Sequence, residues 1–227
     1  MPPASLAKRI TLNNGIRMPQ IHLGVYMTSG RECESAVSHA LEAGYLAIDS
    51  AEWYANEKEV GRAIKKYLDA HKEVKREDLW FTTKLKSNVG YDATRKAVKD
   101  SLRKSGLDYI DLYLLHSPYG GKKKRLECWK AVEDAILEGE VKAGGVSNFG
   151  VKHVCCLAVR SLYPMPIQGL PFAFPALLFS VLFTQCLSRG FLCVFLHSLL
   201  PFSSRNAYHS FLFFASTHYF VALSLTP

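Results

Sequence analysis

The chain has 227 residues, which is enough for one sizeable domain and too short for most two-domain enzymes. Its 28 basic and 20 acidic side chains give a formal net charge of +8, and both signs are mixed along helix-like stretches, which is typical of a solvated surface. The six cysteines have neither metal-ligand nor disulfide-framework spacing, so the composition argues against a zinc module and a disulfide-stapled secreted domain, and we expect no metal site.

The first 26 residues predict a polar start followed by one buried strand. Residues 1–15 contain no apolar core, so we expect no signal peptide and a reducing, cytoplasmic location. Asn14-Gly15 predicts a tight turn within a hairpin over residues 10–17. The apolar run over residues 21–26 predicts the first strand of a larger sheet.

Helix-like and strand-like patterns then alternate up to residue 149. Glycines directly after two of the helical stretches act as stop signals. Such alternation implies a parallel sheet covered by helices. We predict helices over residues 31–43, 56–71, 91–105 and 126–137, strands over residues 45–49, 80–85 and 109–115, and a further strand with the loop after it over residues 141–149.

An open doubly wound sheet and a (β/α)₈ barrel both satisfy this α/β pattern. The segment after the first strand, residues 25–30, has no glycine-rich phosphate loop, which favours the barrel. The one basic cluster, residues 122–125, falls in the predicted loop before the last helix. No nucleic-acid-binding motif accompanies it, so we interpret it as a solvated loop and expect no nucleic-acid partner.

The composition changes abruptly near residue 153. Every acidic residue lies at or before Glu140, whereas residues 154–227 hold 11 of the 13 phenylalanines and only three charged side chains, all arginines. We therefore expect an ordered unit over residues 1–153 and an apolar, poorly ordered and aggregation-prone tail over residues 154–227. Residues 167–188 carry no charge and are long enough to cross a bilayer, so membrane association through them is the alternative.

Polar side chains stand at the carboxyl ends of successive predicted strands, where a parallel barrel has its active site. Asp49 ends one strand and Tyr54 follows it, Lys84 ends the next strand, and His116 follows the one after. A tyrosine is a weak acid, and we expect a neighbouring lysine to lower its pKa and make its proton easier to donate. The aspartate would keep the lysine charged, and a neutral histidine would orient a carbonyl group.

The motifs that contain these residues are similar to those of the aldo-keto reductase family, and they occur in the same order. They are residues 44–51 with Tyr54, Glu57, Val60 and Gly61, residues 82–85, residues 111–118, and residues 145–149. The resemblance implies a (β/α)₈ barrel that reduces a small-molecule carbonyl substrate with NADP(H). It implies that Tyr54 is the general acid, that Lys84 is its partner and that Asp49 pairs with Lys84 beside the cofactor.

The resemblance also implies binding roles for residues near the same rim. His116 would orient the substrate carbonyl, and Tyr26 would line the substrate pocket with it. Ser147 and Asn148 would hydrogen-bond the carboxamide of the nicotinamide. Leu46, Ala47, Val25 and Gly144 depart from the usual family pattern, but none of these four departures removes a catalytic group.

The resemblance covers residues 9–153, about five of the eight strands of a barrel. Five strands cannot close a barrel, so we expect the last strand to be unpaired and the inner apolar face of the sheet to be uncovered. Residues 154–227 show no counterpart to the later family units, which carry the pocket for the adenosine 2′-phosphate. We interpret the tail as translated intron or frame-shifted sequence, since 44 of its 74 residues are Phe, Leu, Ser, Pro or Cys.

Three expectations follow for the activity of the chain. The first is NADPH-dependent reduction of aldehydes and ketones to alcohols that is impaired or lost in this chain. The second is an active enzyme that obtains the missing half from the tail or from a partner chain. The third is a non-catalytic fragment with a membrane-associating or aggregation-prone tail. The sequence contains no signal for an oligomeric state.

Overall fold

The computed structural model describes residues 6–12, 14–150, 152–154, 157 and 220–223. The chain divides into two compact units, and all the described residues belong to the first, which comprises residues 1–162 and 220–227. This unit begins with the hairpin that Asn14-Gly15 predicted. Its strands β1 (Arg9–Thr11) and β2 (Arg17–Pro19) pair antiparallel, and Gly15 has φ +83°, a conformation that glycine adopts without strain.

The main sheet has the strand order β3-β4-β5-β6-β7-β8. Its first five strands are parallel, and each pairs with the next one along the chain, which is the connectivity of a barrel. The partial (β/α)₈ barrel predicted from the sequence is therefore confirmed. The strands are β3 (Leu23–Gly24), β4 (Ala47–Asp49), β5 (Trp80–Leu85), β6 (Ile110–Leu115), β7 (Val141–Ser147) and β8 (Phe220–Leu223).

One edge of the sheet differs from the sequence expectation. We expected the last strand of a five-strand fragment to be unpaired, but β8 pairs antiparallel with β7 over four residues of each strand. Its residues lie in the segment that we interpreted as a tail without regular structure. The pairing joins Gly144 to Leu223 and Ser147 to Phe220, so its partners are more than 70 residues apart in the sequence.

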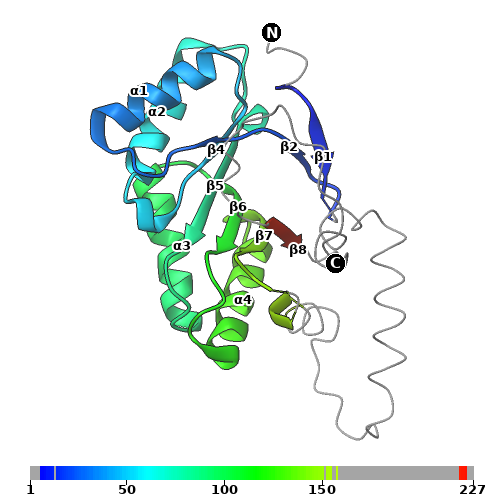
Figure 1. Ribbon diagram of the computed structural model, residues 1–227. Coiled ribbons are helices and arrows are strands. Elements are labelled where there is room, and N and C mark those ends of the chain that lie inside the picture. Colours follow the sequence, from blue (N-terminus) through cyan, green and yellow to red (C-terminus); the bar gives the residue numbers. More distant parts are fainter. Residues whose placement is uncertain (1–5, 13, 151, 155–156, 158–219, 224–227) are drawn as a thin grey trace, which may run out of the picture. The chain divides into compact units, whose positions relative to one another are not determined.

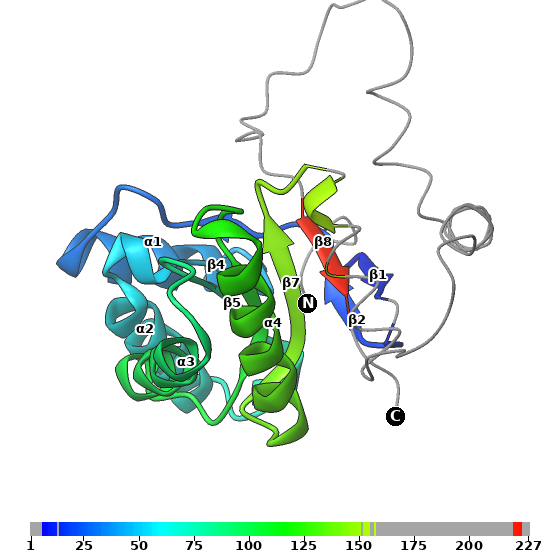
Figure 2. The ribbon, with the colours of Figure 1, turned by 90° about the horizontal axis from the view of Figure 1, so that it is seen from below.

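Four helices cover one face of the sheet, and the β1–β2 hairpin lies on the other (Figures 1 and 2). The helices are α1 (Gly30–Glu42), α2 (Glu57–Ala70), α3 (Tyr91–Ser105) and α4 (Gly121–Leu137). On the hairpin side, Leu12, Ile16 and Met18 pack against a buried cluster of Ala47, Trp80, Leu112, Leu114 and Ala143. The expectation that the inner apolar face would be left uncovered is therefore wrong for this part of the sheet.

Helix α4 begins five residues earlier than predicted, so the basic cluster lies in its first turns and not in a loop. The apolar period that marks the helix starts only at Leu126, which is why the sequence did not predict the earlier start. Two of the lysines, Lys123 and Lys124, are ion-paired with Glu127 one turn further on. The Arg125 guanidinium donates to the carbonyl of Pro118 at 2.7 Å, which joins this turn to the preceding loop.

Within the described part of the chain, no helix is both long and apolar enough to cross a membrane. The candidate span over residues 167–188 lies outside the described residues, as does most of the segment from residue 154 onward.

Candidate active site

The ends of strands β4 and β5 bring a buried lysine against an aspartate. Lys84 is 1% exposed, and its Nζ donates to Asp49 Oδ1 at 2.5 Å and to the carbonyl of Ser50 at 2.8 Å. Both residues stand at the carboxyl ends of their strands, because the β4–β5 register pairs Asp49 with Thr82, two residues before Lys84. The carboxylate and the carbonyl together stabilise an ammonium group that burial alone would disfavour.

Tyr54 reaches the same point from a short 3₁₀ turn, η1 (Glu52–Tyr54), which follows β4. The turn ends at Ala55, whose φ of +55° reverses the chain before α2. The Tyr54 hydroxyl lies 3.5 Å from Lys84 Nζ, and the same ammonium lies 5.0 Å from the centroid of the Tyr54 ring. The three residues Asp49, Tyr54 and Lys84 are thus in one contiguous polar cluster.

The electrostatics of this cluster differ from the sequence expectation in one respect. Burial raises the pKa of Tyr54 to about 12, and the nearby Asp49 carboxylate adds to the rise. Burial also lowers the pKa of Lys84, while Asp49 opposes this change. We expected Lys84 to lower the pKa of Tyr54, but burial and the Asp49 carboxylate together raise it. Tyr54 therefore keeps its proton at neutral pH, as a hydrogen-bond and proton donor must.

Two further rings flank Tyr54. Tyr26, from the loop after β3, has its ring centroid 5.0 Å from that of Tyr54 at an angle of 56°. His116, directly after β6, lies edge-on to Tyr54 with centroids 5.9 Å apart. Tyr26 is 65% exposed, so it stands at the mouth of the site, whereas His116 is half-buried. The phenol of Tyr54 is thus bordered by an aromatic ring, an imidazole and an ammonium group.

Ser147 and Asn148 lie at the carboxyl end of β7, beside His116. Ser147 is fully buried, and Asn148 is exposed with a left-handed backbone at φ +62°. The Asn148 amide donates to the carbonyl of His116 at 2.9 Å and to the Ser147 hydroxyl at 3.1 Å. All the site residues expected from the sequence are therefore at the same end of the sheet.

The sequence did not single out three buried polar residues near the site: Asn56, Glu57 and Asn88. Glu57, quoted only as part of a motif, accepts a hydrogen bond from Thr83, the neighbour of Lys84, and is ion-paired with Lys104 of α3. A charged residue on the apolar face of a predicted helix was the available signal for Glu57. Asn88 lies in a loop without periodic spacing of apolar residues, so nothing in the sequence pattern distinguished it.

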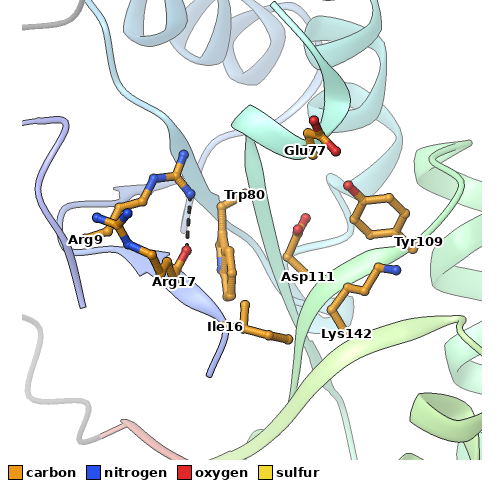
Figure 3. A pocket seen from close by; sticks show the side chains of 8 residues that line it. All are labelled: Arg9, Ile16, Arg17, Glu77, Trp80, Tyr109, Asp111 and Lys142. Atoms are coloured by element: carbon orange, nitrogen blue, oxygen red, sulfur yellow. Dashed lines mark hydrogen bonds between the residues drawn. The ribbon is translucent and has the colours of Figure 1, made fainter. Parts of the chain in front are cut away.

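A second concave region lies at the opposite, amino-terminal end of the strands (Figure 3). It is a pocket of about 380 Å³ between the hairpin and the sheet. Its Asp111 is 2.6 Å from the Arg76 guanidinium, and the Tyr109 ring is contacted by Arg76 and Lys142. Three of the lining residues, Arg9, Ile16 and Arg17, belong to the hairpin, so we interpret this region as the place where the hairpin packs against the sheet. The lining residues are Arg9, Ile16, Arg17, Glu77, Trp80, Tyr109, Asp111 and Lys142.

The described residues contain no group of three or more His, Cys, Asp or Glu side chains placed to hold a metal ion. The cluster of Asp49, Tyr54, Lys84 and His116 is instead suited to proton donation and to hydrogen bonding of a polar substrate group.

Comparison with known proteins identifies the family. The model of the Aldo/keto reductase family matches residues 21–182, and the chain belongs to this family. It is 47% identical over 149 residues to an uncharacterized oxidoreductase of Schizosaccharomyces pombe, covering 66% of this chain and 53% of the relative. It is 43% identical over 145 residues to methylglyoxal reductase DkgA of Escherichia coli, covering 64% and 50%. The chain thus spans about half the length of these curated relatives.

Solved structures agree with this family membership. An aldo/keto reductase from Brucella melitensis superimposes with a TM-score of 0.64 at 42% identity, covering 69% of this chain and 60% of that one. A Bombyx mori aldo-keto reductase in complex with NADP gives a TM-score of 0.62 at 37% identity, covering 69% and 55%.

Proposed function

We propose that this site reduces small aldehydes and ketones to alcohols with NADPH as the hydride source. The observation that carries the proposal is the cluster of Tyr54, Lys84 and Asp49 at the carboxyl ends of β4 and β5, with the Tyr54 hydroxyl 3.5 Å from Lys84 Nζ. Family membership supports it, as do the NADP complex of the Bombyx mori relative and the name of the Escherichia coli one.

In this proposal Tyr54 donates its proton to the carbonyl oxygen of the substrate. The Lys84 ammonium stabilises the phenolate that forms, and Asp49 keeps that ammonium charged. His116, edge-on to Tyr54, donates a hydrogen bond that orients the same carbonyl oxygen. Tyr26 forms an exposed aromatic wall against which an apolar part of the substrate packs.

NADP(H) is the cofactor in this proposal, and the residues present fit its nicotinamide end. Ser147 and Asn148 offer a hydroxyl and an amide side by side, a donor and acceptor set that matches a carboxamide. When bound, the reduced nicotinamide supplies the hydride. Asp49 is the last residue of β4, at the same edge of the sheet, and contributes a negative charge beside the proposed cofactor position.

We further propose that residues 1–153 form the reductase-like unit and that the 227-residue chain by itself turns over slowly or not at all. The support is the coverage: the chain aligns with 53% of the Schizosaccharomyces pombe relative and with 50% of the Escherichia coli one, so about half of each of these two proteins has no aligned counterpart here. A non-catalytic role of a chain with a membrane-associating or aggregation-prone segment after residue 153 is the second candidate, favoured by the apolar composition there.

A chimera tests the proposed chemistry separately from the proposed impairment. Residues 21–153 of this chain replace the matching part of methylglyoxal reductase DkgA, and consumption of NADPH with methylglyoxal is followed by absorbance. We expect the chimera to be active and its Tyr54→Phe variant to lose about 100-fold or more in kcat, since the variant removes the general acid.

The 227-residue chain is assayed beside the chimera under the same conditions. A folded chimera that is inactive, or one that is indifferent to Tyr54→Phe, would contradict the proposed chemistry. Turnover by the 227-residue chain equal to that of the chimera would instead contradict the proposed impairment. Sedimentation of the chain with lipid vesicles, without any turnover, would favour the second candidate.

A further inference from the structure

Asn56 joins the loop that carries Tyr54 to the loop that carries Tyr26. Its side chain is fully buried between the end of β4 and α2. Its amide nitrogen donates to the carbonyls of Val25 at 2.8 Å and Thr28 at 2.9 Å, and its amide oxygen accepts from the Ser50 hydroxyl at 2.7 Å. The two accepting carbonyls stand on either side of Tyr26 in the sequence.

The turn that Asn56 fixes would be unstable without such support. Met27, between the two accepting carbonyls, has φ +62° and is 84% exposed. A non-glycine residue in this left-handed region costs free energy, and surrounding contacts must compensate for it. Two hydrogen bonds from one buried amide, on carbonyls before and after Met27, provide that compensation.

Asn88 holds the loop after His116 in the same way. It is 7% exposed, and its amide nitrogen donates to the carbonyls of Ser117 at 2.6 Å and Tyr119 at 2.7 Å. Gly120 makes room for it: a Cβ on Gly120 would lie 2.5 Å from the backbone oxygen of Asn88. From the other side, Asn148 donates to the carbonyl of His116 itself.

We propose that Asn56 and Asn88 are positioning residues, which hold Tyr26 and His116 on two sides of the Tyr54 ring. The effect of this arrangement on turnover rests on the proposed function. The arrangement of the rings itself does not depend on it. A primary amide suits the role because its nitrogen has two hydrogens and so bridges two carbonyls in a fixed geometry. In each of the two asparagines, the amide nitrogen donates both hydrogens to carbonyls of the loop that follows a neighbouring strand.

In an open sheet, the hydrogen bonds of Asn56 and Asn88 have a specific role. Loops at the ends of strands are the most mobile parts of a domain, yet catalytic groups must be held to within a fraction of an ångström. The hydrogen bonds of Asn56 and Asn88 connect loops of neighbouring strands, so they hold these loops in place without contacts from outside the five parallel strands. The geometry around Tyr54 is therefore set by this part of the chain itself.

Nuclear Overhauser contacts between the rings test the proposal without cofactor or substrate. The full chain is labelled with ¹³C in the tyrosine and histidine rings, and cross-peaks between Tyr26 and Tyr54 and between Tyr54 and His116 are recorded. We expect Asn56→Ala to lose the Tyr26–Tyr54 cross-peak and keep the Tyr54–His116 one. We expect Asn88→Ala to do the reverse, a selectivity that general destabilisation does not produce.

Asn14→Ala is the matched control, because Asn14 also makes hydrogen bonds to backbone but lies in the hairpin at the far end of the strands. It keeps both cross-peaks. If either alanine variant fails to fold, Ser50→Ala removes one bond of Asn56, and Gly120→Ala crowds the seat of Asn88. Gly120→Ala is expected to lose the Tyr54–His116 cross-peak selectively. Ser50→Ala leaves both donor bonds of Asn56 in place, so it is expected to weaken the Tyr26–Tyr54 cross-peak selectively without abolishing it.

The proposal is wrong if folded variants keep both cross-peaks, or if one variant loses both together. Because no turnover is measured, an inactive chain leaves this result unchanged. Failure of the proposed function and failure of the positioning role are therefore separate outcomes.

Discussion

At the residue scale, the candidate site depends on an ammonium group buried beside one carboxylate. Burial lowers the pKa of Lys84, and Asp49 at 2.5 Å raises it in opposition. Replacing Asp49 by asparagine removes the opposing charge, so we expect the pKa of Lys84 to fall further. In the chimera, kcat at neutral pH should fall by about 100-fold, because Lys84 then assists proton transfer less well. The pKa of Lys84 is followed by NMR titration of its ¹³Cε group.

Asp100→Asn is the matched control for this prediction. Asp100 pairs with Lys96 and Arg103 on α3, and its side chain is 29% exposed. Its replacement should leave the Lys84 titration unchanged. A Lys84 pKa that stays the same or rises in Asp49→Asn would show that Asp49 does not keep the ammonium charged.

His22, directly before β3, predicts a dependence of stability on pH. Burial lowers the pKa of His22, although its ring nitrogen lies 2.9 Å from the carbonyl of Pro19. As pH falls below the unfolded value of about 6.5, the unfolded chain binds a proton that the folded chain resists. Stability is therefore lost on acidification from that pH down through the lower pKa of folded His22.

Replacing His22 by glutamine should flatten this loss of stability. Urea denaturation of both chains between pH 5 and pH 8 measures the effect, and the difference between them should be largest at the acidic end. His39→Gln, an exposed position on α1, is the control and should keep the original slope. An unchanged slope in His22→Gln would assign the acid sensitivity to other groups.

The sequence predicted the positions of the site residues better than their electrostatics. Asp49, Lys84 and His116 were found because strand ends can be read from apolar runs, and the structure brings them to one rim. The pKa of Tyr54 was predicted in the wrong direction, because burial and the nearby Asp49 carboxylate both raise it. Both effects need three-dimensional distances.

At the element scale, the packing of α2 against α3 depends on one residue without a side chain. A Cβ on Gly61 would lie 1.9 Å from the backbone oxygen of Ser105, at the end of α3. Since this obstacle is backbone, Gly61→Ala must push the helices apart. We expect a loss of about 2–3 kcal/mol in the free energy of unfolding, measured by urea denaturation.

Gly24 provides the comparison, because a Cβ there meets no atom within 4 Å and its backbone needs no positive φ. Gly24→Ala should change stability by less than about 1 kcal/mol. If both substitutions changed the free energy of unfolding equally, α2 and α3 would be able to move apart at a smaller cost than their close contact indicates.

Local patterns predicted most of the elements but not those that depend on distant partners. Strand β5 and helix α3 have the predicted bounds, because apolar runs and a terminal glycine define them. Helix α4 starts earlier than predicted because Lys123 and Lys124 are stabilised by Glu127 and not by an apolar period. Strand β8 forms by pairing with β7, a contact that no local pattern contains.

At the scale of the whole molecule, the described sheet is an open series from β3 to β8, and the chain covers about half of its curated relatives. In the proposed function, Ser147 and Asn148 would bind only the nicotinamide end of the cofactor, while the family resemblance implies that the adenosine 2′-phosphate pocket belongs to later units. We therefore expect the 227-residue chain to bind NADPH at least about 100-fold more weakly than methylglyoxal reductase DkgA, a difference of about 2.7 kcal/mol.

Titration of NADPH fluorescence against the chain, the chimera and DkgA measures this difference. The chimera restores the later units while keeping residues 21–153, so its Kd should approach that of DkgA. If the 227-residue chain binds as tightly as the chimera, its own later residues supply the missing contacts, and the second sequence expectation holds. If the chimera also binds weakly, the loss originates within residues 21–153, where Val25, Leu46, Ala47 and Gly144 depart from the family pattern.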